Sequence, residues 1–213
     1  MKVLDLLSLH MKGAAGSLAD MRVARDTLME GVCPLGPGVA LALVRAGAVE
    51  FEVVAAPNVP MGCRSLLLLV HGGMFVTGSP RAVRHLAARL SADVGIPVAT
   101  PRLRVAPEFP YPAALDDLDA AYALLEAQGV SAGEQLEALG GGAEKFVSMG
   151  PPEQIAVFAE SSGAALAMGA LMRRRDARKP PPAALVMASP WLDMTCSGTS
   201  YAANEKLDLV MQV

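Results

Sequence analysis

A serine within a run of small residues is the group in this sequence best placed to do chemistry. Ser161 lies in the stretch AESSGAALA at 159–167, directly after the apolar run 155–158. The apolar run predicts a buried strand and residues 164–175 predict a helix, so the serine is expected in a tight strand-to-helix turn. Such a turn sets a hydroxyl at a helix N-terminus, where N–H groups and the helix dipole stabilise an oxyanion. These residues predict a nucleophile, and the alternative is a serine that only caps the helix.

The elements that would position this serine alternate between strands and helices from residue 65 onward. Such alternation predicts βαβ units, a mostly parallel sheet and the α/β fold class. Later strands are expected at 65–70, 96–100, 155–158 and 183–188. Helices are expected at 81–94, 113–128 and 164–175, with a shorter one within 132–139, and 189–201 is expected to be loop. Two earlier runs, 39–44 and 49–55, predict a hairpin that forms the antiparallel edge of the sheet.

The N-terminal segment predicts one or two helices outside this core. Apolar residues recur at helical spacing at Leu18, Met21, Ala24 and Leu28. This stripe could pack on the core or form a flap over a pocket, and both readings stay open. The expected organisation is a helical lid segment at 1–31 and a core at 32–213.

Composition excludes several classes of function. A net charge of −3 over 213 residues offers no basic face for nucleic acid. The three cysteines and three histidines show no metal-ligand spacing, and no apolar run is long enough to span a membrane. The N-terminus lacks the features of a secretory signal. We therefore expect a cytoplasmic protein that binds a small molecule and needs no metal or cofactor, with its oligomeric state left open.

Four collinear stretches carry a family resemblance. They are HGGMFVTGS at 71–79, RVAPEFPYPAALDD at 104–117, AESSGAALA at 159–167 and SPWLDMTCSGTSY at 189–201. In this order and spacing they resemble the hormone-sensitive-lipase group of α/β-hydrolases, the carboxylesterases and lipases marked by HGGG and GDSAG motifs. The resemblance covers about residues 39–213. It implies an α/β-hydrolase fold, incomplete at the C-terminal end, and hydrolysis of carboxylic esters.

The resemblance implies a catalytic role for five residues. Ser161 matches the family nucleophile. The oxyanion hole would be formed by the N–H of Ser162 and by the loop Gly72, Gly73 and Met74.

Other matched residues would support the site. His71 corresponds to a structural residue of the oxyanion loop and not to the catalytic base. Arg104 and Glu108 would form a buried ion pair that braces the neighbouring loop, and solvated charges are the alternative. Trp191 and Asp193 match a segment at the far end of the sheet, where packing is the expected role.

Two motifs depart from the family pattern at several positions: the nucleophile elbow, which is the strand-to-helix turn around Ser161, and the oxyanion loop at 71–74. Gly163 keeps the second elbow glycine, but Ala159 replaces the first and Glu160 stands where the family has aspartate. Met74 replaces the third glycine of HGGG, and Leu103 stands where a tyrosine is usual. None of these changes removes a catalytic group.

The larger departure concerns the base and the acid of the triad. In α/β-hydrolases the order is Ser, Asp or Glu, then His. No histidine follows Ser161, and none of the carboxylates after it matches the family's triad acid. The chain is interpreted as truncated relative to the family and is expected to hydrolyse esters weakly or not at all. The alternatives are a non-catalytic module that binds a small apolar ligand, by analogy with plant gibberellin receptors that resemble the same esterase family, or a degenerate fragment without activity.

Overall fold

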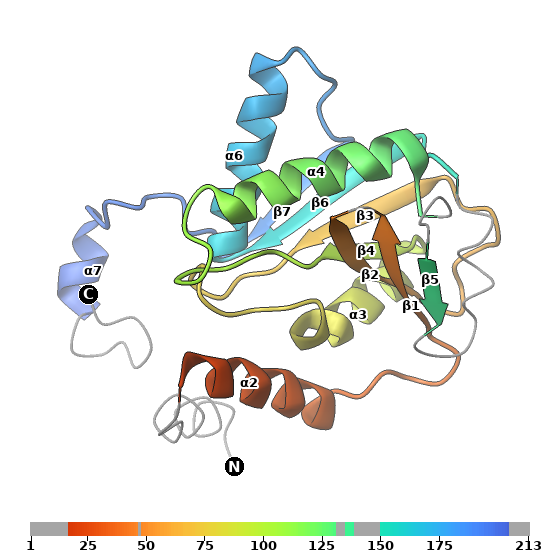
Figure 1. The fold of residues 1–213 in the computed structure, drawn as a ribbon, viewed down its shortest axis with the longest axis horizontal. Coiled ribbons are helices and arrows are strands. Elements are labelled where there is room, and N and C mark those ends of the chain that lie inside the picture. The colour runs from red at the N-terminus through yellow and green to blue at the C-terminus, as the bar shows by residue number, and fades with distance from the viewer. Residues whose placement is uncertain (1–16, 47, 131–134, 139–149, 205–213) are drawn as a thin grey trace.

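A seven-stranded mixed sheet forms the middle layer of the fold (Figure 1). The computed structural model describes residues 17–46, 48–130, 135–138 and 150–204, and the strand count refers to these. The strands are β1 (Ala40–Ala46), β2 (Val49–Ala55), β3 (Ser65–Val70), β4 (Val98–Pro101), β5 (Gln135–Ala138), β6 (Gln154–Glu160) and β7 (Ala184–Ala188). Their order is β5-β1-β2-β4-β3-β6-β7. The pairs β4–β3, β3–β6 and β6–β7 are parallel and the other pairs are antiparallel.

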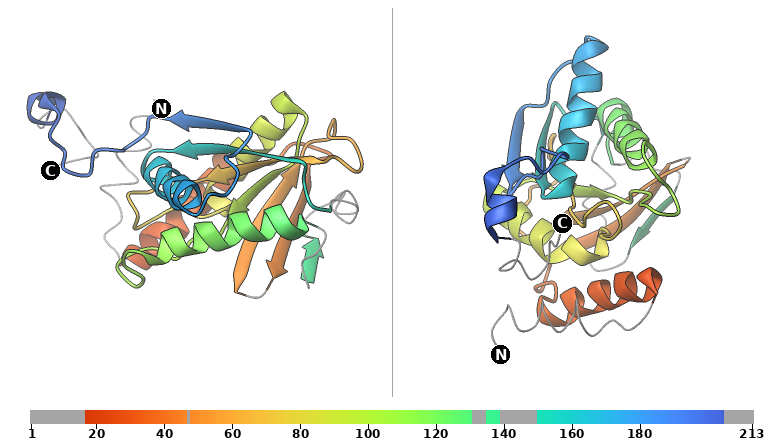
Figure 2. Two further views of the ribbon diagram at one scale, coloured as in Figure 1. Left: turned by 90° about the horizontal axis from the view of Figure 1, so that it is seen from above. Right: turned by 90° about the vertical axis from the view of Figure 1, so that its left-hand side faces the viewer.

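Helices cover both faces of this sheet (Figures 1 and 2). α4 (Ala113–Gln128) and α6 (Ser162–Asp176) lie on one face, and the short 3₁₀ helix η1 (Arg81–Val83) and α3 (Arg84–Val94) lie on the other. The alternation of β3 explains why both faces are apolar. Leu66, Leu68 and Val70 pack with α4 and α6, whereas Leu67 and Leu69 pack against α3. The expected α/β fold with helices on both faces is confirmed.

The parallel register of β3 and β6 fixes where the two predicted motifs meet. Val70 pairs with Ala159, so both strands end at the same edge of the sheet. The chain leaves β3 into the segment that begins at His71 and leaves β6 into the turn at Ser161. The carboxyl ends of parallel strands are the usual place for a site in such sheets.

Most predicted elements are confirmed, and three expectations are corrected. The short helix predicted within 132–139 is wrong for the described residues Gln135–Ala138, which form β5. β5 pairs with β1, so the β1–β2 hairpin is not the edge of the sheet. Pairing with β5 satisfies the backbone N–H and C=O groups along the open side of β1. Local sequence does not predict such a pairing between distant segments. The expected loop after β7 also ends earlier, because α7 (Thr199–Asn204) begins within it.

The helix α2 (Leu18–Val32) lies outside the two layers that cover the sheet, next to η1 and α3 (Figure 1). A capping box starts it: the Ser17 hydroxyl accepts the Asp20 N–H, and the Asp20 carboxylate accepts the Ser17 N–H. None of the residues in α2 is buried. The apolar stripe therefore does not pack into the core, and the predicted helix is confirmed over 18–31. Residues 1–16 of the predicted lid lie outside the described residues.

In the described part of the chain, no helix combines the length and apolar character needed to cross a membrane.

The strand β7 is an edge with no partner on its outer side among the described residues. Val186 at its centre is 53% exposed. Exposed apolar edge strands pair with other chains, so we expect this chain to self-associate at micromolar concentration. Val186→Lys should reduce the association, which analytical ultracentrifugation would measure. Val94→Lys, at the equally exposed end of α3, is the control that should not, and a monodisperse wild-type monomer would contradict the prediction.

Candidate active site

Ser161 joins β6 to α6 in a backbone conformation that residues with side chains rarely adopt. Its φ is 52° and its ψ is −125°, and such a conformation costs roughly 1–3 kcal/mol unless the surroundings enforce it. Here they do, because the Ser161 N–H donates to Ala188 O at 3.0 Å. The Ser161 carbonyl accepts from the N–H groups of Ala164 and Trp191, both at 3.1 Å. The turn is thus held from β7, from α6 and from the segment after β7.

The Ser161 side chain does not cap the helix that follows it. Although Ser161 holds the N-cap position of α6, its hydroxyl makes no capping hydrogen bond. The reading of this serine as a simple helix cap is therefore wrong. A strained turn that leaves its hydroxyl uncommitted is what a nucleophile elbow requires.

The elbow and the loop after β3 touch backbone to backbone. A Cβ on Gly163 would lie 2.4 Å from His71 O and 2.5 Å from Val70 O. A Cβ on Gly72 would lie 2.9 Å from Ser161 Cβ. Only glycine permits this approach at both positions. Ala159, which replaces the first elbow glycine, is fully buried in the core.

The loop that follows β3 is held in a tight turn. Gly73 has φ 135° and Met74 has φ 55°. The Gly73 carbonyl accepts from the N–H groups of Val76 at 3.1 Å and Thr77 at 2.8 Å, and from the Thr77 hydroxyl at 3.0 Å. The Gly73–Met74 peptide is therefore fixed in orientation.

The N–H groups around this turn differ in whether they are free. The Gly72 N–H donates to Glu160 Oε1 at 3.2 Å, so it is engaged and cannot serve as an oxyanion donor in this arrangement. Within the described residues, the N–H groups of Gly73, Met74 and Ser162 meet no acceptor. Ser162 is the first residue of α6, where an N–H has no partner inside the helix.

His71 is packed as a structural residue. It is 3% exposed, its Nδ1 lies 3.0 Å from Gly72 O, and its Nε2 has no hydrogen-bond partner in the described structure. A Cβ on Gly78 would lie 2.4 Å from Nδ1, so backbone also encloses the ring. Burial lowers the pKa of His71 below its ordinary value. The ring is therefore neutral near pH 7.

The predicted ion pair between Arg104 and Glu108 is wrong. Arg104 instead binds Asp117 of α4, with its Nη2 at 2.7 Å and its Nε at 2.9 Å from Oδ1. Glu108 accepts two hydrogen bonds from Arg22 of α2, at 2.8 and 2.9 Å. Both side chains are half exposed rather than buried. Sequence alone could not show that α2 brings an arginine to this loop.

One face of α2 carries charged side chains that contact the loop after β3, and the sequence patterns above did not predict these contacts. Arg22 also donates to Val76 O and Ala106 O, both at 2.8 Å. Arg25 donates to the Thr77 hydroxyl at 3.0 Å, and Asp26 accepts from the Ser79 hydroxyl at 2.6 Å. The i, i+3, i+4 spacing of residues 22, 25 and 26 was the available signal, because it places them on one helix face.

The segment after β7 also reaches the elbow. The rings of Trp191 and Phe75 lie 5.8 Å apart, which agrees with the packing role predicted for Trp191. Asp193 accepts hydrogen bonds from the backbone and hydroxyl groups of Thr195 and Ser197. These bonds hold the pKa of Asp193 well below its ordinary value. Its carboxylate is committed to its own loop.

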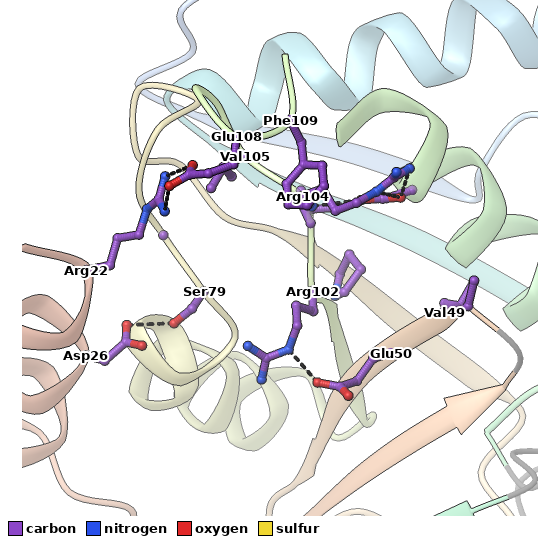
Figure 3. A pocket seen from close by; sticks show the side chains of 15 residues that line it. Arg22, Asp26, Val49, Glu50, Ser79, Arg102, Arg104, Val105, Glu108 and Phe109 are labelled. Carbon is purple, nitrogen blue, oxygen red and sulfur yellow. Dashed lines mark hydrogen bonds and ion pairs between the residues drawn. The ribbon is translucent and has the colours of Figure 1, made fainter. Parts of the chain in front are cut away.

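A cavity of about 560 Å³ opens beside α2, and Ser161 does not line it (Figure 3). Its charged walls pair with one another: Arg22 with Glu108, Arg102 with Glu50, and Arg104 with Asp117. No group of three or more His, Cys, Asp or Glu in the described residues could hold a metal ion.

Comparison with known proteins agrees with this geometry. A family model described as alpha/beta hydrolase fold matches residues 67–212. The chain belongs to the α/β-hydrolase family. An acetyl-hydrolase of Streptomyces hygroscopicus is 33% identical over 98% of this chain and 62% of its own length. An esterase of Acinetobacter venetianus is 27% identical over 84% of this chain and 52% of its own.

Solved structures place this chain in the hormone-sensitive-lipase group of α/β-hydrolases, as the four motifs predicted. The crystal structure of an esterase from the bacterial hormone-sensitive lipase family matches with a TM-score of 0.75 and 28% identity. That match covers 96% of this chain and 62% of the esterase. This α/β-hydrolase thus spans a little over three fifths of the length of such relatives.

The contact at Gly163 predicts a large loss of stability on adding one methyl group. In Gly163→Ala the new Cβ meets two backbone carbonyl oxygens, which cannot move aside as a side chain would. We expect a loss of about 2 kcal/mol or more in unfolding free energy, measured by urea denaturation. Gly169→Ala is the matched control in the same helix, because its Cβ would meet only the flexible Leu115 side chain at 3.3 Å. An equal effect of the two variants would contradict the backbone contact.

The buried His71 predicts that stability falls between pH 7.5 and 5.5. Its pKa is lower in the folded than in the unfolded chain, so below the ordinary value of 6.5 the unfolded state takes up the proton first. Unfolding free energy should fall by at most about 1.4 kcal/mol per pH unit in that window. His71→Gln should flatten the slope and the control His85→Gln should not. An imidazole of His71 that is protonated at pH 6 by NMR would refute the prediction.

Proposed function

We propose that this chain carries the nucleophile and the oxyanion hole of a serine-dependent carboxylic ester hydrolase. The observation that carries the proposal is the enforced conformation of Ser161 at φ 52° and ψ −125° between a parallel strand and a helix. This turn presents the hydroxyl at the N-terminus of α6, where the helix dipole favours developing negative charge. Ser161 Oγ bonds to the ester carbonyl carbon and gives up its proton, the C–O bond to the alcohol breaks, and the alcohol leaves with a proton. Water then cleaves the acyl-serine ester, which releases the acid and restores the hydroxyl.

The oxyanion would be held by backbone donors on two sides of the turn. These are the N–H of Ser162 and the N–H groups of Gly73 and Met74, which meet no acceptor in the described structure. Each such donor contributes roughly 3 kcal/mol to stabilising the transition state. The contact of Gly72 with the elbow brings the two sets of donors together. Gly72 therefore serves as a spacer, with its own N–H bound to Glu160.

The names of the relatives support an ester substrate. They include an acetyl-hydrolase of Streptomyces hygroscopicus and an ethyl acetate hydrolase of Pseudomonas putida. The latter is 39% identical over 39% of this chain. A small-molecule ester with a short acyl group is thus the substrate class with which to begin.

In the described part of the chain, no histidine forms a hydrogen bond with Ser161 and could serve as its base. No histidine follows Ser161 among the 213 residues, and the buried His71 is enclosed by the backbone of its own loop. Without the histidine, only about 10³–10⁴-fold acceleration over water remains, from the oxyanion hole and substrate binding. We therefore propose that the chain as given hydrolyses esters weakly.

The test compares two adjacent serines. A fluorophosphonate probe should form a covalent bond to Ser161, located by peptide mass spectrometry, and hydrolysis of p-nitrophenyl acetate should be above the uncatalysed rate. Ser161→Ala should abolish both, because the attacking atom is lost. Ser162→Ala should keep most of both, because this residue contributes its backbone N–H. Equal losses in two folded variants would show that the roles are misassigned.

Absence of both reactions in the folded wild-type chain would overturn hydrolysis and leave a ligand-binding module.

A further inference from the structure

The orientation of one peptide group determines where a proposed oxyanion donor points. The Gly73 carbonyl and the Met74 N–H belong to the same planar trans peptide, so they point in opposite directions. Whatever fixes the Gly73 oxygen therefore aims the Met74 hydrogen. Both residues have positive φ, at 135° and 55°, so the peptide lies in a conformation that depends on outside support.

The Thr77 hydroxyl supplies part of that support from a side chain. It donates to Gly73 O at 3.0 Å, beside the backbone N–H groups of Val76 and Thr77. Thr77 is 8% exposed, so water has little access to replace this bond. A bond to the carbonyl also polarises the peptide and makes its N–H a stronger donor.

Arg25 of α2 fixes the direction of the hydroxyl. Its Nη1 donates to Thr77 Oγ1 at 3.0 Å. A guanidinium can only donate, so the single hydroxyl hydrogen is left for Gly73 O. The result is a directed chain from a cation through Thr77 to the peptide that carries the Met74 N–H.

The same helix is fastened to the loop on either side of this contact. Arg22 donates to Val76 O at 2.8 Å, and Asp26 accepts from the Ser79 hydroxyl at 2.6 Å. Farther along α2, Glu30 binds Arg81 and Arg84. Residues of α2 are at most half-buried, and these polar contacts hold the helix face that carries Arg25.

We propose that Arg25 is a positioning residue of the active site, acting through Thr77 to aim the Met74 N–H at the oxyanion. The inference rests on the proposed function, because it concerns the same oxyanion hole. Arg25 touches no reacting atom. Its effect is confined to the orientation and polarity of the Gly73–Met74 peptide.

The decisive variants each alter one side chain of the relay, which is the hydrogen-bond chain from Arg25 through Thr77 to the Gly73 carbonyl. Thr77→Val keeps the shape and removes the hydroxyl, whereas Thr77→Ser keeps the hydroxyl and should behave like wild type. Arg25→Gln removes the cation. Arg89→Gln is the matched control, because Arg89 lies on α3 with its side chain 77% exposed and paired with Asp93.

Turnover of p-nitrophenyl acetate is the first measurement. A donor that acts on the transition state changes kcat and leaves KM unchanged. We expect Thr77→Val and Arg25→Gln each to lower kcat about tenfold, as a tilted donor keeps only part of its effect. Because the two residues act in series, the double variant should lose no more than Thr77→Val alone. Full additivity, a change in KM alone, or no rescue by Thr77→Ser would overturn the relay.

Amide hydrogen exchange of Val76 and Thr77 is the second measurement and does not depend on activity. Both N–H groups bind the Gly73 oxygen, so loosening that peptide should speed their exchange in Thr77→Val and Arg25→Gln. It should stay unchanged in Thr77→Ser and Arg89→Gln. If wild type and Ser161→Ala hydrolyse the ester equally, the proposed function fails. The exchange rates alone then test whether Arg25 and Thr77 orient the Gly73–Met74 peptide. Unchanged exchange in Thr77→Val and Arg25→Gln would overturn it.

Discussion

The close contact between two backbones is the constraint on which the rest of this site depends. Gly163, in the first turn of α6, lies against the carbonyl oxygens of Val70 and His71. Any side chain at this position would push the elbow away from the loop that follows β3. The contact is possible because β3 and β6 are adjacent and parallel, with Val70 opposite Ala159. Sheet register, and not the motifs themselves, brings the serine and the glycine loop to one place.

Polar contacts, in contrast, set the position of α2. One buried carboxylate takes part: Glu52, on β2, is 3% exposed and binds Arg84, which in turn binds Glu30 of α2. Burial makes this ion pair less sensitive to salt than the half-exposed pair of Arg22 and Glu108. The ion pairs that hold the two ends of α2 therefore differ in burial and in their sensitivity to salt. The end at Glu30 is joined to the core, and the end at Arg22 is joined to a surface loop.

Sequence predicted the elements and motifs well because both are local. The strand–turn–helix around Ser161 follows from an apolar run, small residues and helix formers that are adjacent in the chain. The partners of Arg104 and Glu108 could not be predicted in this way. Glu108 pairs with Arg22, 86 residues away, and the choice depends on where α2 docks. Likewise, β5 forms because β1 offers an open side, which is a property of the assembled sheet.

The absence of buried residues in α2 has a consequence for its response to temperature. The heat capacity of an unfolding step follows the apolar surface it exposes. Separation of α2 would expose side chains that are at most half-buried, whereas melting of the sheet would expose the two buried apolar layers. The docking free energy of this helix should therefore curve less with temperature than the stability of the core. The proposed oxyanion donors thus belong to supports with different thermal behaviour: Ser162 belongs to the core, and Met74 depends partly on a helix held by charged groups.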